Sequence, residues 1–210
     1  MTRIYVASSN KGKLADFAAA AREHGVDVCP LPGIDKIAAP EETGATFEEN
    51  ARLKADYYSP HAGGEILIAD DSGLTVDVLG GEPGVRSARY AEDAGIVTNH
   101  PDVANNQLLL ERTASVPDSQ RQCAFVCSIA AARDGKTVRV FNADAHGILL
   151  RAPQGSNGFG YDPLFYFPEL RKSFAEISRE EKLRVSHRGK AFRLFLEWID
   201  ETARSRSLVT

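Results

Sequence analysis

The stretch "TRIYVASSNKGKLADFAAAA", residues 2–21, decides the fold class, because it changes from the pattern of a strand to that of a helix. Residues 3–8, "RIYVAS", predict a short apolar strand. A stripe of apolar side chains at i, i+3, i+4 and i+7 follows, formed by Leu14, Phe17, Ala18 and Ala21. The first unit is therefore a strand, a polar turn and a helix.

The next segments predict a mixed sheet. Thr46 and Glu49 form a capping box before a helix with the stripe Phe47, Ala51, Ala55 and Tyr58. Residues 65–70, "EILIAD", predict a strand that ends in two acids. Residues 123–147 predict two long strands around a turn at residues 134–135, so an antiparallel pair joins the parallel strands. We expect an α/β fold, a mixed β-sheet with flanking helices.

Two helix starts are predicted near the C-terminus. Ser178 and Glu181 form a second capping box, and Ser186 precedes a last helix. The apolar stripe of that helix is Ala191, Leu194, Phe195, Trp198 and Ile199. We expect residues 1–210 to form a single domain, with a surface excursion at residues 93–106 and a frayed tail at about residues 204–210.

Composition limits the function classes. The chain has 210 residues, 43% apolar content, 26% charged residues and a net charge of −4, which predict a globular protein without a basic surface for nucleic acid polymers. No apolar run approaches the roughly 18 residues of a spanning helix, and we expect a soluble, cytoplasmic protein. Cys123 and Cys127 lie about 13 Å apart along a strand and cannot pair, so buried thiols in a reducing compartment are expected.

The polar turn "SSNKGK", residues 8–13, lies between a strand and a helix N-terminus. Backbone N–H groups and the helix dipole favour an anion at such a position, and Lys11 and Lys13 add positive charge. A polar helix entry with solvated lysines is the alternative interpretation.

A second polar group, "ADDSGL", spans residues 69–74. Asp70 and Asp71 must point to opposite faces of the strand, so only one of them easily faces a cleft. With Ser72 they suit a hard cation, although two acids at a strand end often mark only a turn. Glu42, in the loop before the Thr46 helix, is the candidate to complete a cation site.

Two later segments concentrate glycines and basic groups. The loop "QGSNGFGYDPLF", residues 154–165, has neither a Walker motif nor the glycine spacing of a dinucleotide fold. The segment "EKLRVSHRGKAF", residues 181–192, gathers basic donors at a helix start, although a histidine beside an arginine is often only a surface pair. The donors are Lys182, His187, Arg188 and Lys190.

Taken in order, five motifs resemble those of the inosine triphosphate pyrophosphatase family, whose members act on non-canonical purine nucleotides. The motifs are "SSNKGK", "EETGATFEENARLKA", "ADDSGLTVDVLGGEPGVRSARYA", "GFGYDPLF" and "SHRGKAF", and the resemblance extends from about residue 3 to about residue 199. It implies an elongated fold with two lobes around a nucleotide cleft, a homodimer and dependence on Mg2+. The implied reaction is hydrolysis of ITP, dITP or XTP to the monophosphate and pyrophosphate.

The resemblance also implies site residues. Glu42 and Asp71 would bind the metal, and Asp71 would be the catalytic acid-base residue. The residues implied to bind substrate are Ser8, Ser9, Asn10, Lys11, Gly12, Lys13, Ser72, Phe159, Gly160, Tyr161, Asp162, Lys182, His187 and Arg188. The chain departs from the family pattern at Ser8 and Ser9, where relatives often have Thr and Gly.

Three alternatives stay open. A pyrophosphatase of the related Maf-like group would differ at "GFGYDP" and "SHRGKAF". A nucleotide-binding sensor without turnover is opposed by the complete set Glu42, Asp71, Lys13 and Lys182. A plain α/β scaffold explains each motif separately but not all five together.

Overall fold

The computed structural model describes residues 2–21 and 24–207, which divide into two compact units. Unit 1 comprises residues up to Asp71 together with Cys127–Ala143 and the segment that begins at His187, and unit 2 comprises Ser72–Val126 and Asp144–Ser186. The strands β3, β4 and β5 each have residues in both units. That residues 1–210 form a single domain stays a prediction.

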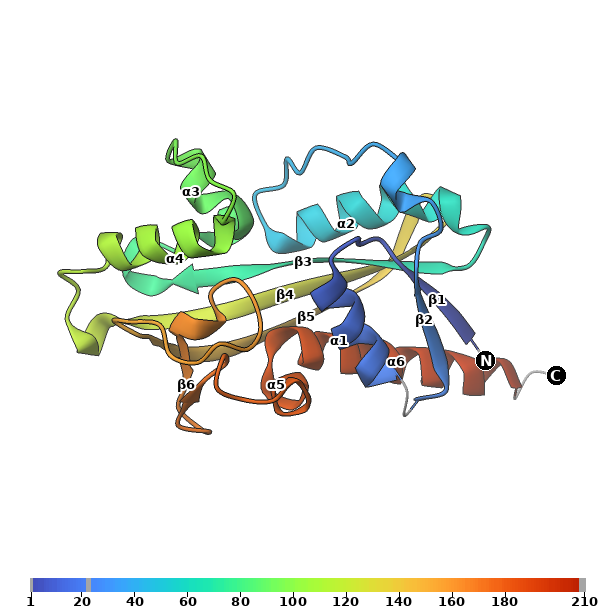
Figure 1. Ribbon diagram of the computed structural model, residues 1–210. Helices are drawn as coiled ribbons and strands as arrows, with labels where there is room; N and C mark the ends of the chain where they lie inside the picture. The colour runs from blue at the N-terminus through green and yellow to red at the C-terminus, as the bar shows by residue number, and fades with distance from the viewer. Residues whose placement is uncertain (1, 22–23, 208–210) are drawn as a thin grey trace. The chain divides into compact units, whose positions relative to one another are not determined.

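Helices and strands alternate along the described chain as far as β3, and two helices, four strands and two helices follow (Figure 1). The strands are β1 (Thr2–Val6), β2 (Val26–Pro30), β3 (Ile66–Val76), β4 (Gln122–Arg133), β5 (Lys136–Leu149), β6 (Phe165–Phe167) and β7 (Lys172–Ser173). The α-helices are α1 (Lys11–Ala21), α2 (Phe47–Tyr58), α3 (Tyr90–Asp93), α4 (Pro101–Arg112), α5 (Arg179–Val185) and α6 (His187–Ser207). Short 3-10 turns, among them η5 (Gly84–Arg89) and η7 (Asp162–Leu164), join them.

The described strands form a 7-stranded sheet of order β2-β1-β3-β4-β5-β6-β7. β1 pairs in parallel with β2 and β3, whereas β5–β6 and β6–β7 are antiparallel, so the predicted mixed sheet is confirmed. The turn between β4 and β5 is the predicted one. Asp134 and Gly135 have φ of 50° and 82°, the left-handed conformation that a type I′ two-residue hairpin turn requires at both positions.

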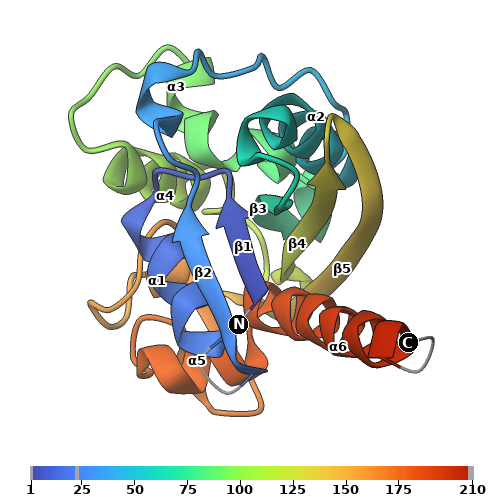
Figure 2. The same ribbon diagram turned by 90° about the vertical axis from the view of Figure 1, so that its right-hand side faces the viewer.

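Unit 1 has an apolar core on each face of its strands. Side chains of a strand point alternately to its two faces, and β3 follows this rule. Ile68 packs with Phe17 of α1 and Phe192 of α6, whereas Leu67 packs with Ala51 of α2. Figure 2 shows α2 on one side of the strands and α1 with α6 on the other. Burying a large apolar side chain stabilises the fold by about 1.5–3 kcal/mol, so both helical layers are held mainly by these contacts.

The structure corrects one predicted strand end. β3 does not end at Asp70 and Asp71 but continues to Val76. The alternation of apolar residues continues through Leu74 and Val76, both fully buried in the core of unit 2. The backbone N–H of Leu74 donates to Ser87 Oγ at 2.9 Å, which satisfies the continued strand. Both acids therefore lie inside a strand.

The structure also corrects the stripe of the last helix. Leu194 is 44% exposed, whereas Phe192 and Leu196 are 1% and 0% exposed. Phe192, Phe195, Leu196 and Ile199 have the i, i+3, i+4, i+7 spacing of one helix face, and Leu194 lies about 100° away from Phe195. α6 extends to Ser207, so residues 204–207 of the predicted tail are helical, and residues 208–210 lie outside the described part.

Unit 2 encloses an aromatic core in which Phe125, Phe165 and Phe174 lie with ring centroids 4.6 to 5.8 Å apart. The predicted excursion at residues 93–106 contains the start of α4, whose Leu109 is fully buried in this core. The excursion is thus only partly exposed chain.

Local predictions of caps and thiols are confirmed. The capping boxes at Thr46 and Ser178 have both of their reciprocal hydrogen bonds. Cys123 and Cys127 are buried free thiols, and Cys29 is a partly buried one. Across residues 2–21 and 24–207, no helix has the length and apolar character needed to cross a membrane.

Candidate functional site

The polar turn before α1 is held by its own side chains. Asn10 Oδ1 accepts from the backbone N–H of Lys13 at 3.1 Å, and the N–H of Asn10 donates to Ser8 Oγ at 3.1 Å. Asn10 therefore caps α1, and Ser9, Asn10 and Lys11 are exposed beside it. This leaves an accessible helix N-terminus, which favours an anion.

The buried carboxylate of Asp70 pairs with two cationic side chains, Lys13 of α1 and Arg188 of α6. Its Oδ2 lies 2.9 Å from Lys13 Nζ and 3.5 Å from Arg188 Nε, and Arg188 Nη1 lies 3.6 Å from Asp16 Oδ2. Burial disfavours the charge, but Lys13, Arg188 and Lys54 outweigh it and hold the pKa of Asp70 below its usual value. The sequence assigned no role to Asp70, whereas the structure places it in contact with two predicted site residues, Lys13 and Arg188.

The neighbouring carboxylate, Asp71, lies on the α2 side of β3. Lys54 Nζ lies 2.8 Å from Asp71 Oδ1 and 3.3 Å from Glu42 Oε1, and Asn50 Nδ2 donates to Asp71 Oδ2 at 3.4 Å. Burial raises the pKa of Asp71, and the Lys54 ammonium only partly opposes this rise. The two predicted metal ligands are thus brought together around one cation, and the two acids face opposite sides as predicted.

Asn50 and Lys54 were not among the predicted site residues. They are four residues apart on α2, so they share one helix face, and that spacing was the available signal. For Lys54, burial lowers the pKa, but the carboxylates of Asp71, Asp70 and Glu42 reverse this and leave the pKa raised. The lysine is therefore charged at neutral pH.

The donor set of unit 1 suits a hard cation that a substrate helps to bind. In the part of the chain that the structure describes, no group of three or more His, Cys, Asp and Glu residues is placed to hold a metal. Mg2+ is usually bound through one or two carboxylates, with water and substrate phosphates as the remaining ligands. Glu42 and Asp71, sharing the Lys54 ammonium, fit that requirement.

In unit 2 the glycine loop folds around the buried carboxylate of Asp162. Its Oδ2 accepts from the backbone N–H of Phe159 at 2.9 Å and from the ammonium of Lys182. Gly158 has φ of 78°, and a Cβ there would lie 2.0 Å from Asp162 Oδ2. Glycine is therefore required at this position, because a side chain would displace the carboxylate.

The two aromatic residues of the loop have different environments. Tyr161 is buried in the core of unit 2, and its hydroxyl donates to the carbonyl of Ser87 at 2.9 Å. Phe159 is only partly buried, and Lys182 Nζ lies 4.9 Å from the centroid of its ring. Phe159, rather than Tyr161, has a ring that a ligand can reach.

The predicted site residues thus fall into two groups, each within one unit. Unit 1 contains Ser8, Ser9, Asn10, Lys11, Gly12, Lys13, Glu42, Asp71, His187 and Arg188. Unit 2 contains Ser72, Phe159, Gly160, Tyr161, Asp162 and Lys182. In unit 1 the structure brings Glu42 close to Asp71, and in unit 2 it joins Phe159, Asp162 and Lys182.

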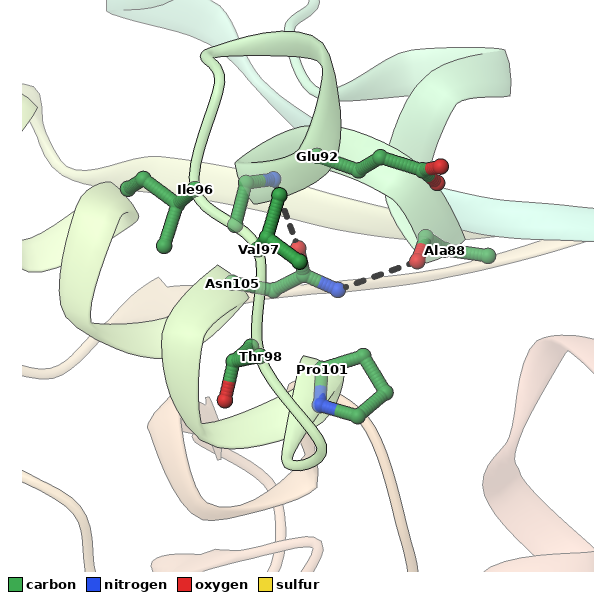
Figure 3. Close-up of a pocket in the computed structure, with 8 residues that line it drawn as sticks. Ala88, Glu92, Ile96, Val97, Thr98, Pro101 and Asn105 are labelled. Atoms are coloured by element: carbon green, nitrogen blue, oxygen red, sulfur yellow. Dashed lines mark hydrogen bonds between the residues drawn. The ribbon is translucent and has the colours of Figure 1, made fainter.

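A pocket of about 230 Å³ lies in unit 2 (Figure 3). It is lined by Ala88, Ala91, Glu92, Ile96, Val97, Thr98, Pro101 and Asn105. None of the predicted site residues lines it.

Comparison with known proteins shows similarity over most of this chain and most of each relative. The Ham1 family matches residues 4–198. A dITP/XTP pyrophosphatase of Acidobacterium capsulatum is 53% identical, with 92% of this chain and 96% of the relative covered. One of Escherichia coli O157:H7 is 44% identical, with 94% and 98% covered.

Solved structures agree with this assignment. A HAM1 protein from Coxiella burnetii superposes with a TM-score of 0.83 at 36% identity, covering 96% of this chain and 100% of that one. A nucleoside-triphosphatase, or dITP/XTP pyrophosphatase, from Mycobacterium abscessus superposes with a TM-score of 0.71 at 40% identity, covering 93% and 99%.

Proposed function

Because the chain belongs to the Ham1 family, we propose that it is a nucleoside triphosphate pyrophosphatase acting on ITP, dITP and XTP. The products are the nucleoside monophosphate and pyrophosphate. Relatives that are 53% and 44% identical over nearly their whole length are dITP/XTP pyrophosphatases. The observation that carries the proposal is the pair of carboxylates, Glu42 and Asp71, gathered around Lys54 in unit 1.

Unit 1 supplies the groups that bind phosphate. The α1 N-terminus, with Ser8 to Lys13, offers backbone N–H groups and a favourable dipole to the triphosphate. Lys13 lies in contact with Asp70, so its ammonium has a defined position before substrate arrives. Cations that are already oriented stabilise the charge of the leaving pyrophosphate without further reorganisation.

Glu42 and Asp71 are the residues that we assign to a Mg2+ ion. The ion, when bound, neutralises phosphate charge and polarises the phosphoryl oxygens. Glu42 and Asp71 would hold the ion through their carboxylate oxygens, and its charge would add to that of Lys54 in neutralising them. The assignment of Mg2+ is supported by the all-oxygen donor set.

Asp71 is the proposed general base. Hydrolysis requires water to attack the α-phosphorus and to lose a proton. Burial by itself raises the pKa of Asp71, whereas a bound divalent cation would favour the ionised carboxylate that accepts the proton. Lys54 and Asn50 each contact one oxygen of this carboxylate and so fix its orientation.

Unit 2 supplies groups for the base. The partly buried ring of Phe159 offers a stacking face, and Gly158 and Gly160 allow the backbone to approach a ligand. Asp162 is assigned as an acceptor for a ring N–H, and Ser72 and Lys182 as further substrate contacts.

The same proposal assigns His187 or Arg188 as the donor to a 6-oxo group. Adenine presents an amino donor at that position, and an unsatisfied buried donor costs about 1–3 kcal/mol, which corresponds to roughly 5- to 150-fold in affinity.

Two further features are proposed with the activity. We infer a homodimer from the resemblance of the motifs, and light scattering after size-exclusion chromatography measures it directly. A monomer of 22.8 kDa at working concentration contradicts this inference. A cytoplasmic location is supported by the buried free thiols Cys123 and Cys127, which suit a reducing compartment.

The decisive experiment is a product assay. Purified protein is incubated with Mg2+ and, separately, ITP, XTP, GTP and ATP, and pyrophosphate and orthophosphate are measured. Pyrophosphate release from ITP or XTP at rates orders of magnitude above ATP and GTP is expected. Four inert nucleotides, or orthophosphate as the product, contradict the proposal.

The catalytic assignment has its own test. Asp71→Asn keeps the shape of the side chain but removes most of its basicity, and we expect it to abolish turnover. Glu48→Gln, an exposed carboxylate of α2 paired with Arg52, is the matched control and is expected to retain activity. Turnover by Asp71→Asn at saturating Mg2+ refutes the role of Asp71.

A further inference from the structure

The excursion at residues 93–106 contains a helix start whose polar side chains contact the glycine loop. Pro101 is the first residue of α4, and Asp102 and Asn106 follow at positions four residues apart. Residues spaced by four lie on one helix face, so both side chains are presented together. The other side of this helix is anchored by Leu109, which is fully buried.

Asp102 and Asn106 bind the two polar groups of Gly160. The backbone N–H of Gly160 donates to Asp102 Oδ2 at 2.8 Å, and its carbonyl accepts from Asn106 Nδ2 at 2.9 Å. Gly160 has φ of 61°, and a glycine adopts this backbone conformation and several others at similar energy. The hydrogen bonds with Asp102 and Asn106 therefore hold Gly160 in one of the backbone conformations open to it.

Asn105 fixes this helix start to the preceding turn. Its Oδ1 accepts from the N–H of Ala91 at 2.8 Å, and its Nδ2 donates to the carbonyl of Ala88 at 3.2 Å (Figure 3). The same Nδ2 also donates to the carbonyl of Ser87 at 3.3 Å. The carbonyl of Ser87 also accepts from the Tyr161 hydroxyl, next to Gly160 in the loop. The loop and α4 thus share a common anchor.

These contacts contribute little to stability by themselves. Asp102 is exposed, and an exposed hydrogen bond competes with water. Asn106 Oδ1 is buried, and among the described residues none donates a hydrogen bond to it. Leaving a buried acceptor without a hydrogen bond costs at least as much free energy as one neutral hydrogen bond contributes. The Asn106 amide therefore gives no net stabilisation that would explain its presence.

We propose that Asp102 and Asn106 are positioning residues for purine selection, acting through Gly160 on the ring of Phe159. This rests on the proposed function, in which Phe159 stacks on the base. Phe159 precedes Gly160, and its own N–H is held by Asp162. With the backbone on both sides of Phe159 held, the point from which its ring projects is fixed, and a base of the wrong hydrogen-bonding pattern cannot be accommodated by a shift of the loop.

The test compares four variants. Asn106→Ala and Asp102→Ala remove one contact each, whereas Asp102→Asn keeps an oxygen that accepts from Gly160. Gln107→Ala is the matched control, because Gln107 is exposed on the same helix and donates to exposed Glu111 at 3.0 Å. The measurements are kcat/KM for ITP and ATP, the melting temperature, and amide exchange of Gly160 by NMR on protein labelled with ¹⁵N-glycine, in which 17 glycines give a tractable spectrum.

We expect Asn106→Ala and Asp102→Ala to accelerate Gly160 exchange and to lower the ITP-to-ATP ratio of kcat/KM about tenfold, since a displacement of about 1 Å can cost 100-fold. The main change is expected in KM for ITP. Asp102→Asn should recover most of the ratio, and Gln107→Ala should match the wild type.

Three results overturn the proposal. They are an unchanged Gly160 exchange rate, a ratio within twofold of wild type despite faster exchange, and equal losses on both nucleotides that parallel the melting temperature. If the wild-type protein releases no pyrophosphate from ITP, the proposed function fails. The Gly160 exchange rates then still decide whether α4 positions the loop.

Discussion

Replacing Asp70 by Asn tests the central electrostatic contact of unit 1. Asp70 carries one negative charge between Lys13 at 2.9 Å and Arg188 at 3.5 Å. Asn preserves the shape of the side chain and one acceptor oxygen but removes the charge. Lys13 and Arg188 then face each other's positive charge without the carboxylate between them.

The magnitude follows from the burial of the pair. Removing one partner of a buried ion pair costs about 3–5 kcal/mol. The side chain of Arg188 is only 4% exposed, but that of Lys13 is 20% exposed and recovers part of its hydration, which places the expected loss near the lower end. We expect about 3 kcal/mol, a large share of the roughly 5–15 kcal/mol that stabilises a typical domain.

Urea unfolding followed by tryptophan fluorescence measures the loss of stability in unit 1, which contains Asp70. Trp198 is the one tryptophan of the chain and packs against Phe141 and Phe195 in unit 1. With an m-value of about 2–3 kcal/mol/M, the expected loss lowers the midpoint by roughly 1 M or more. Glu48→Gln is the control, because its pair with Arg52 is exposed and worth about 0–1 kcal/mol.

The pH dependence provides a second readout. The pKa of Asp70 is lowered in the folded chain, so its contribution is present above the unfolded value of 3.8 and is lost as pH falls below it. The difference between wild type and Asp70→Asn should be constant from about pH 8 to 5 and shrink in more acidic solution. A loss under about 1 kcal/mol at pH 7, equal to that of Glu48→Gln, refutes the reasoning.

Three other predictions follow from single contacts. Burial raises the pKa of Cys123 and of Cys127 from 9.0 to about 12. The free energy of unfolding should therefore fall as pH rises above 9, by on the order of 2 kcal/mol per thiol at pH 10.5. In chemical unfolding, the free energy of the double Ala variant should depend less steeply on alkaline pH than that of the wild type, and an equally steep dependence contradicts this cause. Gly158→Ala should displace Asp162 and raise KM for ITP at least tenfold, with strain of about 1–2 kcal/mol visible in thermal melting; an unchanged KM means that the loop tolerates the new Cβ. Arg121 is buried and donates to three backbone carbonyls and to one threonine hydroxyl, so Arg121→Met should cost about 3 kcal/mol or more by leaving them unsatisfied; a calorimetric loss under 1 kcal/mol would show that water replaces it.

Local signals were enough to predict much of the fold. The capping boxes at Thr46 and Ser178 join atoms three residues apart, and the turn at residues 134–135 depends on two adjacent backbone conformations. Such features are decided within one or two turns of chain, so their residue types carry the information directly.

The errors arose where a local pattern was ambiguous. Asp70 and Asp71 look like the end of a strand because acids favour turns, yet β3 continues, since Leu74 and Val76 are buried and Ser87 receives the Leu74 N–H. Leu194 looked like a core residue because it is apolar, but the face of α6 that packs in the core of unit 1 contains Phe192 and Leu196 instead. Tertiary packing decided both cases.

The sequence by itself determined the fold class, the starts of α1, α2, α5 and α6, and the motif residues, because these depend on neighbours along the chain. It did not determine which charges meet. That Asp70 binds Lys13 and Arg188, that Asp71 and Glu42 share Lys54, and that Asp102 holds Gly160 across 58 residues are results of tertiary structure. A hydrogen bond or ion pair acts over about 3 Å, so its partners are chosen by the packing of the apolar cores, which no local sequence pattern records.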